Sequence, residues 1–336
     1  MIASVQFRHF KALRAASLRL EPFNLVIGPN GSGKTSLVQA ILQLRALAAR
    51  PAGAAPAPAA GPETRPPNRP EIVFRFTPPD HDIEVHLGCA AGPVCDRLEA
   101  YHPPAAGPRW EALRARLQGI RAYLFDHYAM AEPADPAGGG ELATNGRNLG
   151  AVLAAMRAGR PEVFARLEAE FCRALPDYTA IAPQPAGDGR VVLALRLAEE
   201  SAVLTAENLS QGALYTLAVL TLSFAAAPPT VVCLEEADRG LHPRLLREVR
   251  DALYRLAYPA SCGEEREAVQ IVATTHSPYL LDLFRDHPEE IVVASRRGGG
   301  ATFERLGDRP GVREILREGS LGDLWFSGIL GGVPED

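Results

Sequence analysis

The stretch FNLVIGPNGSGKTSLVQAI, Phe23 to Ile41, decides the fold of this protein. It begins as an apolar, strand-like run, passes through a glycine-rich turn and continues with the apolar spacing of a helix. The turn, Gly28 to Ser36, fits the pattern GxxxxGK[ST]. Its glycines let the backbone turn back on itself, so that successive N–H groups point at phosphate oxygens, and the helix adds its positive N-terminal end. A chance glycine-rich turn would lack this context, so we predict a phosphate-binding loop.

Individual positions of this loop have predicted roles in binding a nucleoside triphosphate with its metal ion. Lys34 is expected to bridge the β- and γ-phosphates, and the Thr35 hydroxyl is expected to hold Mg²⁺. The other predicted nucleotide-binding residues of the loop are Asn30, Gly31, Ser32, Gly33 and Ser36.

A second motif, VVCLEEADRGLHP from Val231 to Pro243, places two glutamates directly after a buried run. In a fold with such a loop, we expect a second strand beside the first to direct carboxylates towards Mg²⁺ and the attacking water. Glu235 ends the apolar run and is predicted to hold Mg²⁺, whereas Glu236 is predicted to accept a proton from the hydrolytic water. In the alternative, the strand simply turns polar where it reaches the surface. The phosphate-binding loop with Lys34 elsewhere in the chain argues against this alternative, because it supplies a metal–triphosphate for the two carboxylates to face.

Composition and charge fit a globular protein. The 336 residues can bury a substantial core, and the net charge of -5 gives no overall attraction to nucleic acid or anionic lipid. The longest apolar run, Ala213 to Ala227, is too short to cross a bilayer, and the N-terminus lacks the apolar core of a signal peptide. The five cysteines include no CxxC pair, which fits a reducing compartment without a structural metal. We therefore expect a cytoplasmic protein without a membrane partner.

Apolar periodicity also predicts the order of the elements. Two short strands open the chain, and the proline-rich stretch from Arg50 to Pro70 is expected to be a flexible loop. After it, the patterns predict strands at 71–76 and 82–87, a helix at 109–118, a strand at 122–128, helices at 148–156 and 161–175, and a hairpin at 190–197 and 201–206.

From Ala213 onwards helices alternate with buried strands, which is typical of a parallel sheet. The predicted fold class is α/β, with a mixed parallel core sheet, an antiparallel β-subdomain and an inserted helical lobe. We predict a single domain over 1–336, in which 1–50 and 200–336 form the nucleotide-binding core and 51–199 is an insertion.

Four motifs, GPNGSGKTS, ENLSQG, CLEEADRGLHP and IVATTHSP, occur in the order and spacing of an ABC-type ATPase head, which the sequence resembles. The likeness is to the chromosome-maintenance and recombination-mediator branch and to overcoming-lysogenization-defect (OLD) ATPases. It implies ATP and Mg²⁺ as ligands, ATP hydrolysis as the activity, and a homodimer or higher homo-oligomer with ATP sandwiched between heads. About sixty residues follow the last motif, too few for the nuclease domain that OLD-like proteins often carry.

The resemblance assigns further roles by position. Ser210, Gln211 and Gly212 match the signature motif, which in this family binds the γ-phosphate held by the opposite subunit; taken alone, this stretch would be a plain helix N-cap. Asp238 matches the loop that crosses the dimer interface, and His276 matches the switch histidine that contacts the γ-phosphate.

The sequence departs from the family pattern in places. The metal-binding position is Glu235 where most of the superfamily has Asp, although the OLD-like branch also uses Glu. Ala237 replaces the usual proline. The glutamine that normally links the metal to the helical lobe is left open between Gln118 and Gln184.

Two surfaces are candidates for partners. The stretch RWEALRARLQGIRAY could contact DNA or be a solvated helix face; its arginines are Arg109, Arg114, Arg116 and Arg121. The C-terminal stretch LGDLWFSGILGGVP resembles that of small stand-alone ATPases that work with a separately encoded companion. Its apolar residues could form a docking patch or cover the core; they are Trp325, Phe326, Ile329 and Leu330.

Two functions agree with these motifs. In the first, ATP closes a homodimer and hydrolysis by Glu236 opens it, which gates a DNA-binding surface or an effector in phage defence or DNA repair. In the second, ATP holds an oligomeric scaffold together, which presents a surface to a companion effector and turns over very slowly. A transporter subunit would need a membrane partner, and the LHP context argues against it.

Overall fold

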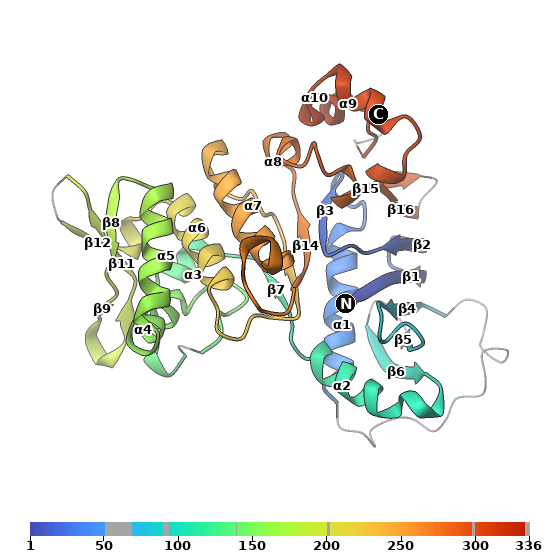
Figure 1. Cartoon of the computed structure of the whole chain (residues 1–336), viewed down its shortest axis with the longest axis horizontal. Helices are drawn as coiled ribbons and strands as arrows, with labels where there is room; N and C mark the ends of the chain where they lie inside the picture. The colour runs from blue at the N-terminus through green and yellow to red at the C-terminus, as the bar shows by residue number, and fades with distance from the viewer. Residues whose placement is uncertain (51–68, 90–93, 139, 200–201, 298–299, 333–336) are drawn as a thin grey trace. The chain divides into compact units, whose positions relative to one another are not determined.

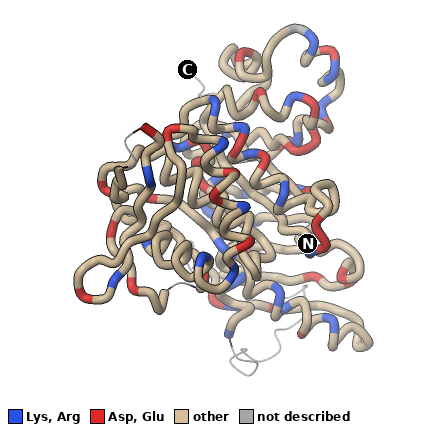
Figure 2. The backbone as a smooth tube through the Cα atoms, turned by 60° about the vertical axis from the view of Figure 1, so that its left-hand side comes forward, with Lys and Arg blue, Asp and Glu red and all other residues tan. Residues whose placement is uncertain are grey.

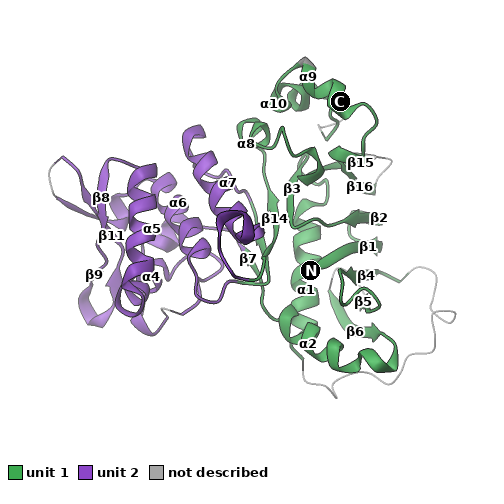
Figure 3. Ribbon diagram, in the orientation of Figure 1, with its two compact units in different colours: residues 1–122, 229–235, 267–336 green, residues 123–228, 236–266 purple. Residues whose placement is uncertain are grey.

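The computed structural model describes residues 1–50, 69–89, 94–138, 140–199, 202–297 and 300–332 (Figure 1). The chain forms two compact units (Figure 3). Unit 1 comprises 1–122, 229–235 and 267–336, and unit 2 comprises 123–228 and 236–266. The loop predicted at 50–70 lies almost wholly outside the described residues. The single-domain boundaries drawn from the sequence stay a prediction.

Unit 1 is built around a six-stranded sheet with the order β16-β15-β3-β14-β13-β7. Strands β15, β3, β14 and β13 run parallel, and β16 returns antiparallel to β15. Every residue of β3, β13 and β14 is buried, as expected for parallel strands covered on both faces. The strand bounds are β3 Phe23–Ile27, β7 Ile120–Tyr123, β13 Val231–Leu234, β14 Gln270–Thr274, β15 Ile291–Arg297 and β16 Gly300–Arg305. This sheet confirms the predicted parallel core.

One predicted neighbour in this sheet is wrong. The sequence analysis places the carboxylate-bearing strand β13 beside β3, but β14 lies between them. Apolar runs identify buried strands without saying which strands pair, and here the chain crosses over after β13 and returns through β14. As a consequence, the residues after β14 lie between the phosphate-binding loop and the end of β13.

The second sheet of unit 1 is antiparallel, with the order β2-β1-β4-β5-β6. Its core side packs in one apolar cluster with the helices α1, Lys34–Ala48, and α2, Gly107–Leu117. The strands are β1 Ile2–Phe10, β2 Leu13–Arg19, β4 Glu71–Phe76, β5 Glu84–Cys89 and β6 Cys95–Tyr101. Strand β6 was not predicted, because it is largely polar and its residues are mostly half-buried. Cys89 and Cys95 form a disulfide between β5 and β6 that the cysteine usage did not predict.

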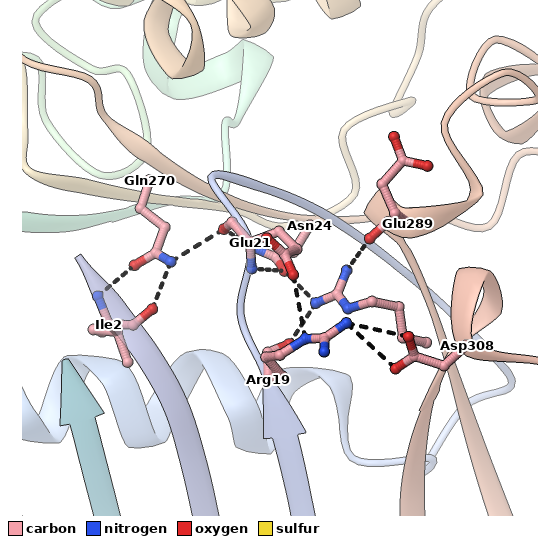
Figure 4. Close-up of polar contacts among 8 residues, drawn as sticks. Ile2, Arg19, Glu21, Asn24, Gln270, Glu289 and Asp308 are labelled. Carbon is pink, nitrogen blue, oxygen red and sulfur yellow. Dashed lines mark hydrogen bonds and ion pairs between the residues drawn. The ribbon is translucent and has the colours of Figure 1, made fainter. Parts of the chain in front are cut away.

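A buried polar network ties the first strand to the core sheet (Figure 4). The Gln270 side chain accepts from the Ile2 N–H at 3.0 Å and donates to the Ile2 carbonyl at 2.8 Å and to the Glu21 carbonyl at 3.1 Å. Arg305 donates to Asn24 Oδ1 at 2.8 Å, and burial lowers the pKa of its guanidinium. Buried polar groups hold a unique arrangement when they are hydrogen-bonded, so this network orders the start of the chain.

Unit 2 is the helical lobe. Its helices are α3 His127–Ala131, α4 Leu149–Gly159, α5 Pro161–Ala174, α6 Gln211–Ser223 and α7 Pro243–Ala257. Its strands are β8 Tyr178–Ile181, β9 Gln184–Pro185, β10 Val191–Val192, β11 Ala194–Leu197 and β12 Val203–Thr205. The predicted hairpin is confirmed, since β11 and β12 pair antiparallel. The strand predicted at 122–128 is wrong beyond Tyr123, because Asp126 caps α3 by accepting from the Ala129 N–H at 2.9 Å.

Helix α6 holds most of the longest apolar run of the sequence. All but the first of its thirteen residues are buried, as expected for a helix that is apolar on every side. No helix in the described ranges is long and apolar enough to span a membrane.

The C-terminal part of unit 1 adds the short helices α8 Pro278–Asp282, α9 Val312–Glu318 and α10 Leu321–Phe326. Some apolar residues of this segment cover the core and others are exposed, and the docking patch stays a prediction. Leu330 is fully buried, and Trp325 Nε1 donates to the Gly332 carbonyl at 3.2 Å. Phe326 and Ile329 are 89% and 52% exposed.

Candidate nucleotide-binding site

The phosphate-binding loop joins β3 to α1 in unit 1. Gly28, Gly31 and Gly33 all have positive φ, between 75° and 147°, which favours glycine at each. Helix α1 begins after Gly33 without a side-chain cap, which leaves its first N–H groups directed at the loop. Lys34 Nζ donates to the carbonyls of Gly28 at 2.7 Å and Pro29 at 2.9 Å, so its side chain runs back along the loop.

The loop fits a phosphate group. Among the residues that the structure describes, the buried Ser32 hydroxyl has no hydrogen-bond partner. An unpaired buried polar group costs free energy, and a phosphate oxygen would satisfy it. Together with the uncapped helix and the glycine turn, this hydroxyl supports nucleotide binding here. Asn30 and Gly31 are exposed at the tip of the loop, and Ser36 is half-buried in the first turn of α1.

The two predicted metal ligands lie together, although 200 positions separate them in the sequence. Thr35 Oγ1 donates to Glu235 Oε2 at 3.1 Å. A hydroxyl and a carboxylate are oxygen ligands of the kind that Mg²⁺ prefers. The neighbouring Cys233 is not a candidate nucleophile, because complete burial, together with the charge of Glu235, raises the pKa of its thiol.

Three predicted groups leave the core sheet at one edge. The phosphate-binding loop follows β3, Glu235 follows β13, and His276 lies two residues beyond β14. Because these strands are parallel and β14 lies between the other two, their carboxyl ends share an edge, which is where α/β sheets bind ligands. The chain beyond β14 stays beside β3, since the Thr275 N–H donates to the Val26 carbonyl at 3.2 Å. His276 is exposed there.

The signature residues lie in unit 2, at the start of α6. Ser210 caps this helix, since its hydroxyl accepts from the Ala213 N–H at 3.2 Å. The plain N-cap interpretation of this serine is therefore what the structure shows, and its role towards a second subunit stays a prediction. Gly212 is buried against the loop that carries Glu236 and Asp238: a Cβ on Gly212 would lie 3.1 Å from the Gly240 carbonyl oxygen.

Glu236 has an unusual backbone. Its φ is +52°, in the left-handed region that residues other than glycine rarely adopt. Its carboxylate is half exposed and lies 3.7 Å from Arg239. Asp238 is half-buried, and its backbone carbonyl accepts a hydrogen bond from the Leu241 N–H at 3.1 Å. Residues 236–241 therefore form a tight turn. The two candidate linking glutamines lie apart from this turn in the sequence, Gln118 after α2 and Gln184 in β9.

Arg296, in β15, is a candidate that the sequence analysis missed. Its Nη1 lies 3.9 Å from where a Cβ on Gly31 would stand, and within the described ranges it has no ion pair. No local pattern could have found it, because only the pairing of β15 with β3 brings it to the loop.

Replacing Arg296 by glutamine is expected to weaken ATP binding about three- to tenfold, because a guanidinium beside a phosphate forms a charge-assisted hydrogen bond. Titration calorimetry would measure the dissociation constant. Arg313→Gln, which removes an exposed charge from α9, serves as the control. Equal affinities of the two variants would exclude a role for Arg296 in nucleotide binding.

The arginines proposed for DNA contact are engaged inside unit 1. Two lie beside the acidic turn at 80–82, and two donate to backbone carbonyls. These are Arg109 with Asp82, Arg116 with Asp80, Arg114 with Ala48 and Arg50, and Arg121 with Gln118 and Ile120. Hydrogen bonding from Arg109 lowers the pKa of Asp82. Figure 2 shows basic and acidic residues interspersed along the chain.

Comparisons with known proteins agree with this architecture. No curated protein matches the sequence. A structure described as "Crystal structure of the SmcHead bound to the C-winged helix domain of ScpA" matches with a TM-score of 0.58 and 15% identity, covering 90% of this chain and 97% of that one. The "SMC head domain from Thermotoga maritima" matches with a TM-score of 0.51 and 13% identity, covering 90% and 98%. The chain therefore has the P-loop NTPase fold of an SMC head.

A protein-family model matches residues 95–282, which include the signature helix, both glutamates and His276. Fold and family together support nucleotide hydrolysis in general, with Mg²⁺ as the usual accompanying ion. Since the matched region is more than half of the chain, the protein belongs to the family described as "AAA domain, putative AbiEii toxin, Type IV TA system".

Proposed function

We propose that this protein is an ATPase that works as a switch: ATP closes a homodimer of heads, and hydrolysis opens it. The observation that carries this proposal is the contact between Thr35 and Glu235 beside an uncapped, glycine-rich loop with an unpaired serine hydroxyl. A hydroxyl and a carboxylate at this place suit a metal–triphosphate. Within the wider ABC-type group we place the protein in the OLD-like branch.

The chain's own residues divide the work of hydrolysis. The loop N–H groups, Ser32 and Lys34 bind the phosphates, and Thr35 and Glu235 would hold Mg²⁺, which supplies charge neutralisation when bound. Glu236 accepts a proton from the attacking water while the water oxygen forms a bond to the γ-phosphorus. The bond between the γ-phosphorus and the β–γ bridging oxygen breaks, and ADP leaves. His276 donates a hydrogen bond to the γ-phosphate. Ser210, Gln211, Gly212 and Asp238 complete the site of a second copy.

A partner is part of the proposal. One SMC head, similar in fold, was solved bound to a domain of ScpA, and here exposed Phe326 and Ile329 would suit a separately encoded companion. If the protein hydrolyses ATP very slowly, the exposed surface at Phe326 and Ile329 favours the second candidate function, in which ATP holds an oligomeric scaffold that presents this surface to an effector. In either case phage defence or DNA repair is the proposed setting. The engaged arginines around α2 do not favour DNA contact there.

The decisive variant is Glu236→Gln. It is expected to abolish hydrolysis, lowering the rate at least about a hundredfold, while Mg-ATP doubles the 36.0 kDa mass measured by light scattering. Glu265→Gln, an exposed glutamate of unit 2, should hydrolyse like the wild type. A mass that ATP leaves unchanged would contradict the sandwich dimer, and a Glu236→Gln variant with wild-type turnover would contradict the role of Glu236.

A further inference from the structure

A hydrogen bond inside unit 2 joins the signature helix to the residue proposed as the general base. The Tyr215 hydroxyl, on α6, donates to the Glu236 carbonyl at 3.1 Å. Tyr215 is 1% exposed, and its ring lies edge-on to Phe125 with the centroids 5.3 Å apart. Burial, and next the charges of Asp238 and Glu236, raise the pKa of this hydroxyl, so it stays a donor at neutral pH.

The same helix holds the turn at its other end. A Cβ on Gly240 would lie 2.3 Å from Gln211 Cδ, so the Gln211 side chain packs directly on this glycine. Gln211 and Tyr215 are four residues apart and therefore share one face of α6. Both ends of the turn at 236–240 thus rest on a single helix face.

Glu236 needs such support. A left-handed backbone costs a residue with a Cβ free energy and persists only where its surroundings impose it. The direction of the Glu236 carboxylate follows from this backbone conformation. The Tyr215 hydroxyl donates a hydrogen bond to the Glu236 carbonyl itself. The same carbonyl also accepts from the Arg239 N–H at 2.8 Å.

We propose that Tyr215 is a positioning residue: it holds the Glu236 backbone in the left-handed conformation that aims the carboxylate at the attacking water, and makes α6 and the turn move as one body. The inference rests on the proposed function, in which Glu236 is the base. A tyrosine that served only as core packing would need its ring and not its hydroxyl.

Tyr215→Phe separates these roles, because it keeps the ring and removes the hydrogen bond. We expect kcat to fall about tenfold, as the loss of one positioning hydrogen bond would give, with the KM for ATP changed less than about twofold. Thr216→Val is the matched control. It deletes the neighbouring buried hydroxyl, which has no hydrogen-bond partner among the described residues, and should leave kcat unchanged.

The outcomes separate this inference from the proposed function. If Glu236→Gln is inactive and Tyr215→Phe has the wild-type kcat, only the inference is overturned. It is also overturned if Thr216→Val loses as much kcat as Tyr215→Phe, or if Tyr215→Phe raises KM instead of lowering kcat. If Glu236→Gln hydrolyses ATP like the wild type, or if the wild type does not hydrolyse ATP, both the inference about Tyr215 and the proposed function are overturned.

Discussion

Replacing Lys34 by methionine is expected to reduce ATP hydrolysis about a hundred- to a thousandfold, the range found when one preorganised charge-stabilising group is removed. The lysine side chain runs back along the loop, where Nζ contacts the carbonyls of Gly28 and Pro29. From there it can follow the negative charge that develops on the γ-phosphate during transfer. Methionine keeps the length and apolar stem of lysine without its charge. A coupled phosphate-release assay would measure the rate.

This chain offers a matched control, since Lys11 is its only other lysine. Lys11→Met removes the same charge from an exposed turn and should hydrolyse ATP like the wild type. In that background Lys34 is the sole lysine, so ATP should protect it from an acylating reagent, which mass spectrometry can follow. A Lys34→Met protein that keeps more than about a tenth of the wild-type rate would contradict the role given to this lysine.

Replacing Gly28 by alanine is expected to destabilise unit 1 by about 3 kcal/mol or more, as overpacking against rigid backbone does at the upper end of single substitutions. An added Cβ would stand 2.2 Å from the Ala294 carbonyl oxygen, and the φ of +147° is unfavourable for alanine. Strand β15 would have to move away from the loop. ATP binding should therefore be lost together with stability, which urea denaturation would show.

Gly159→Ala is the control for this prediction. Gly159 is the exposed last residue of α4, and an added Cβ would meet no atom within 4 Å apart from its chain neighbours and the backbone of its own helix. Alanine has the higher helix propensity, so this variant should unfold at the same or a higher urea concentration than the wild type. If Gly28→Ala unfolds like Gly159→Ala, the close approach of the loop to β15 is not present in solution.

Local sequence patterns were sufficient to predict many of the strands and helices of the core. The order of strand, glycine turn and helix at Phe23 to Ile41 needs only apolar periodicity and glycine chemistry. The alternation after Ala213 likewise predicted the buried strands and α7, because strands covered on both faces must be apolar throughout. Patterns were weaker where burial is partial: β6 is largely polar, and the segment at 122–128 is apolar enough for a strand although Asp126 begins a helix there.

What the sequence determined by itself was the parallel core sheet, together with a prediction of which residues bind phosphate and which hold a metal. Tertiary structure alone decided which of them meet. Thr35 and Glu235 are brought into contact by β3 and β13 with β14 inserted between them, and Arg296 by the pairing of β15 with β3. The bond from Tyr215 to Glu236 depends on how α6 packs on the turn. Side-chain chemistry and periodicity are local, whereas strand order and packing are set by contacts between residues far apart in the chain.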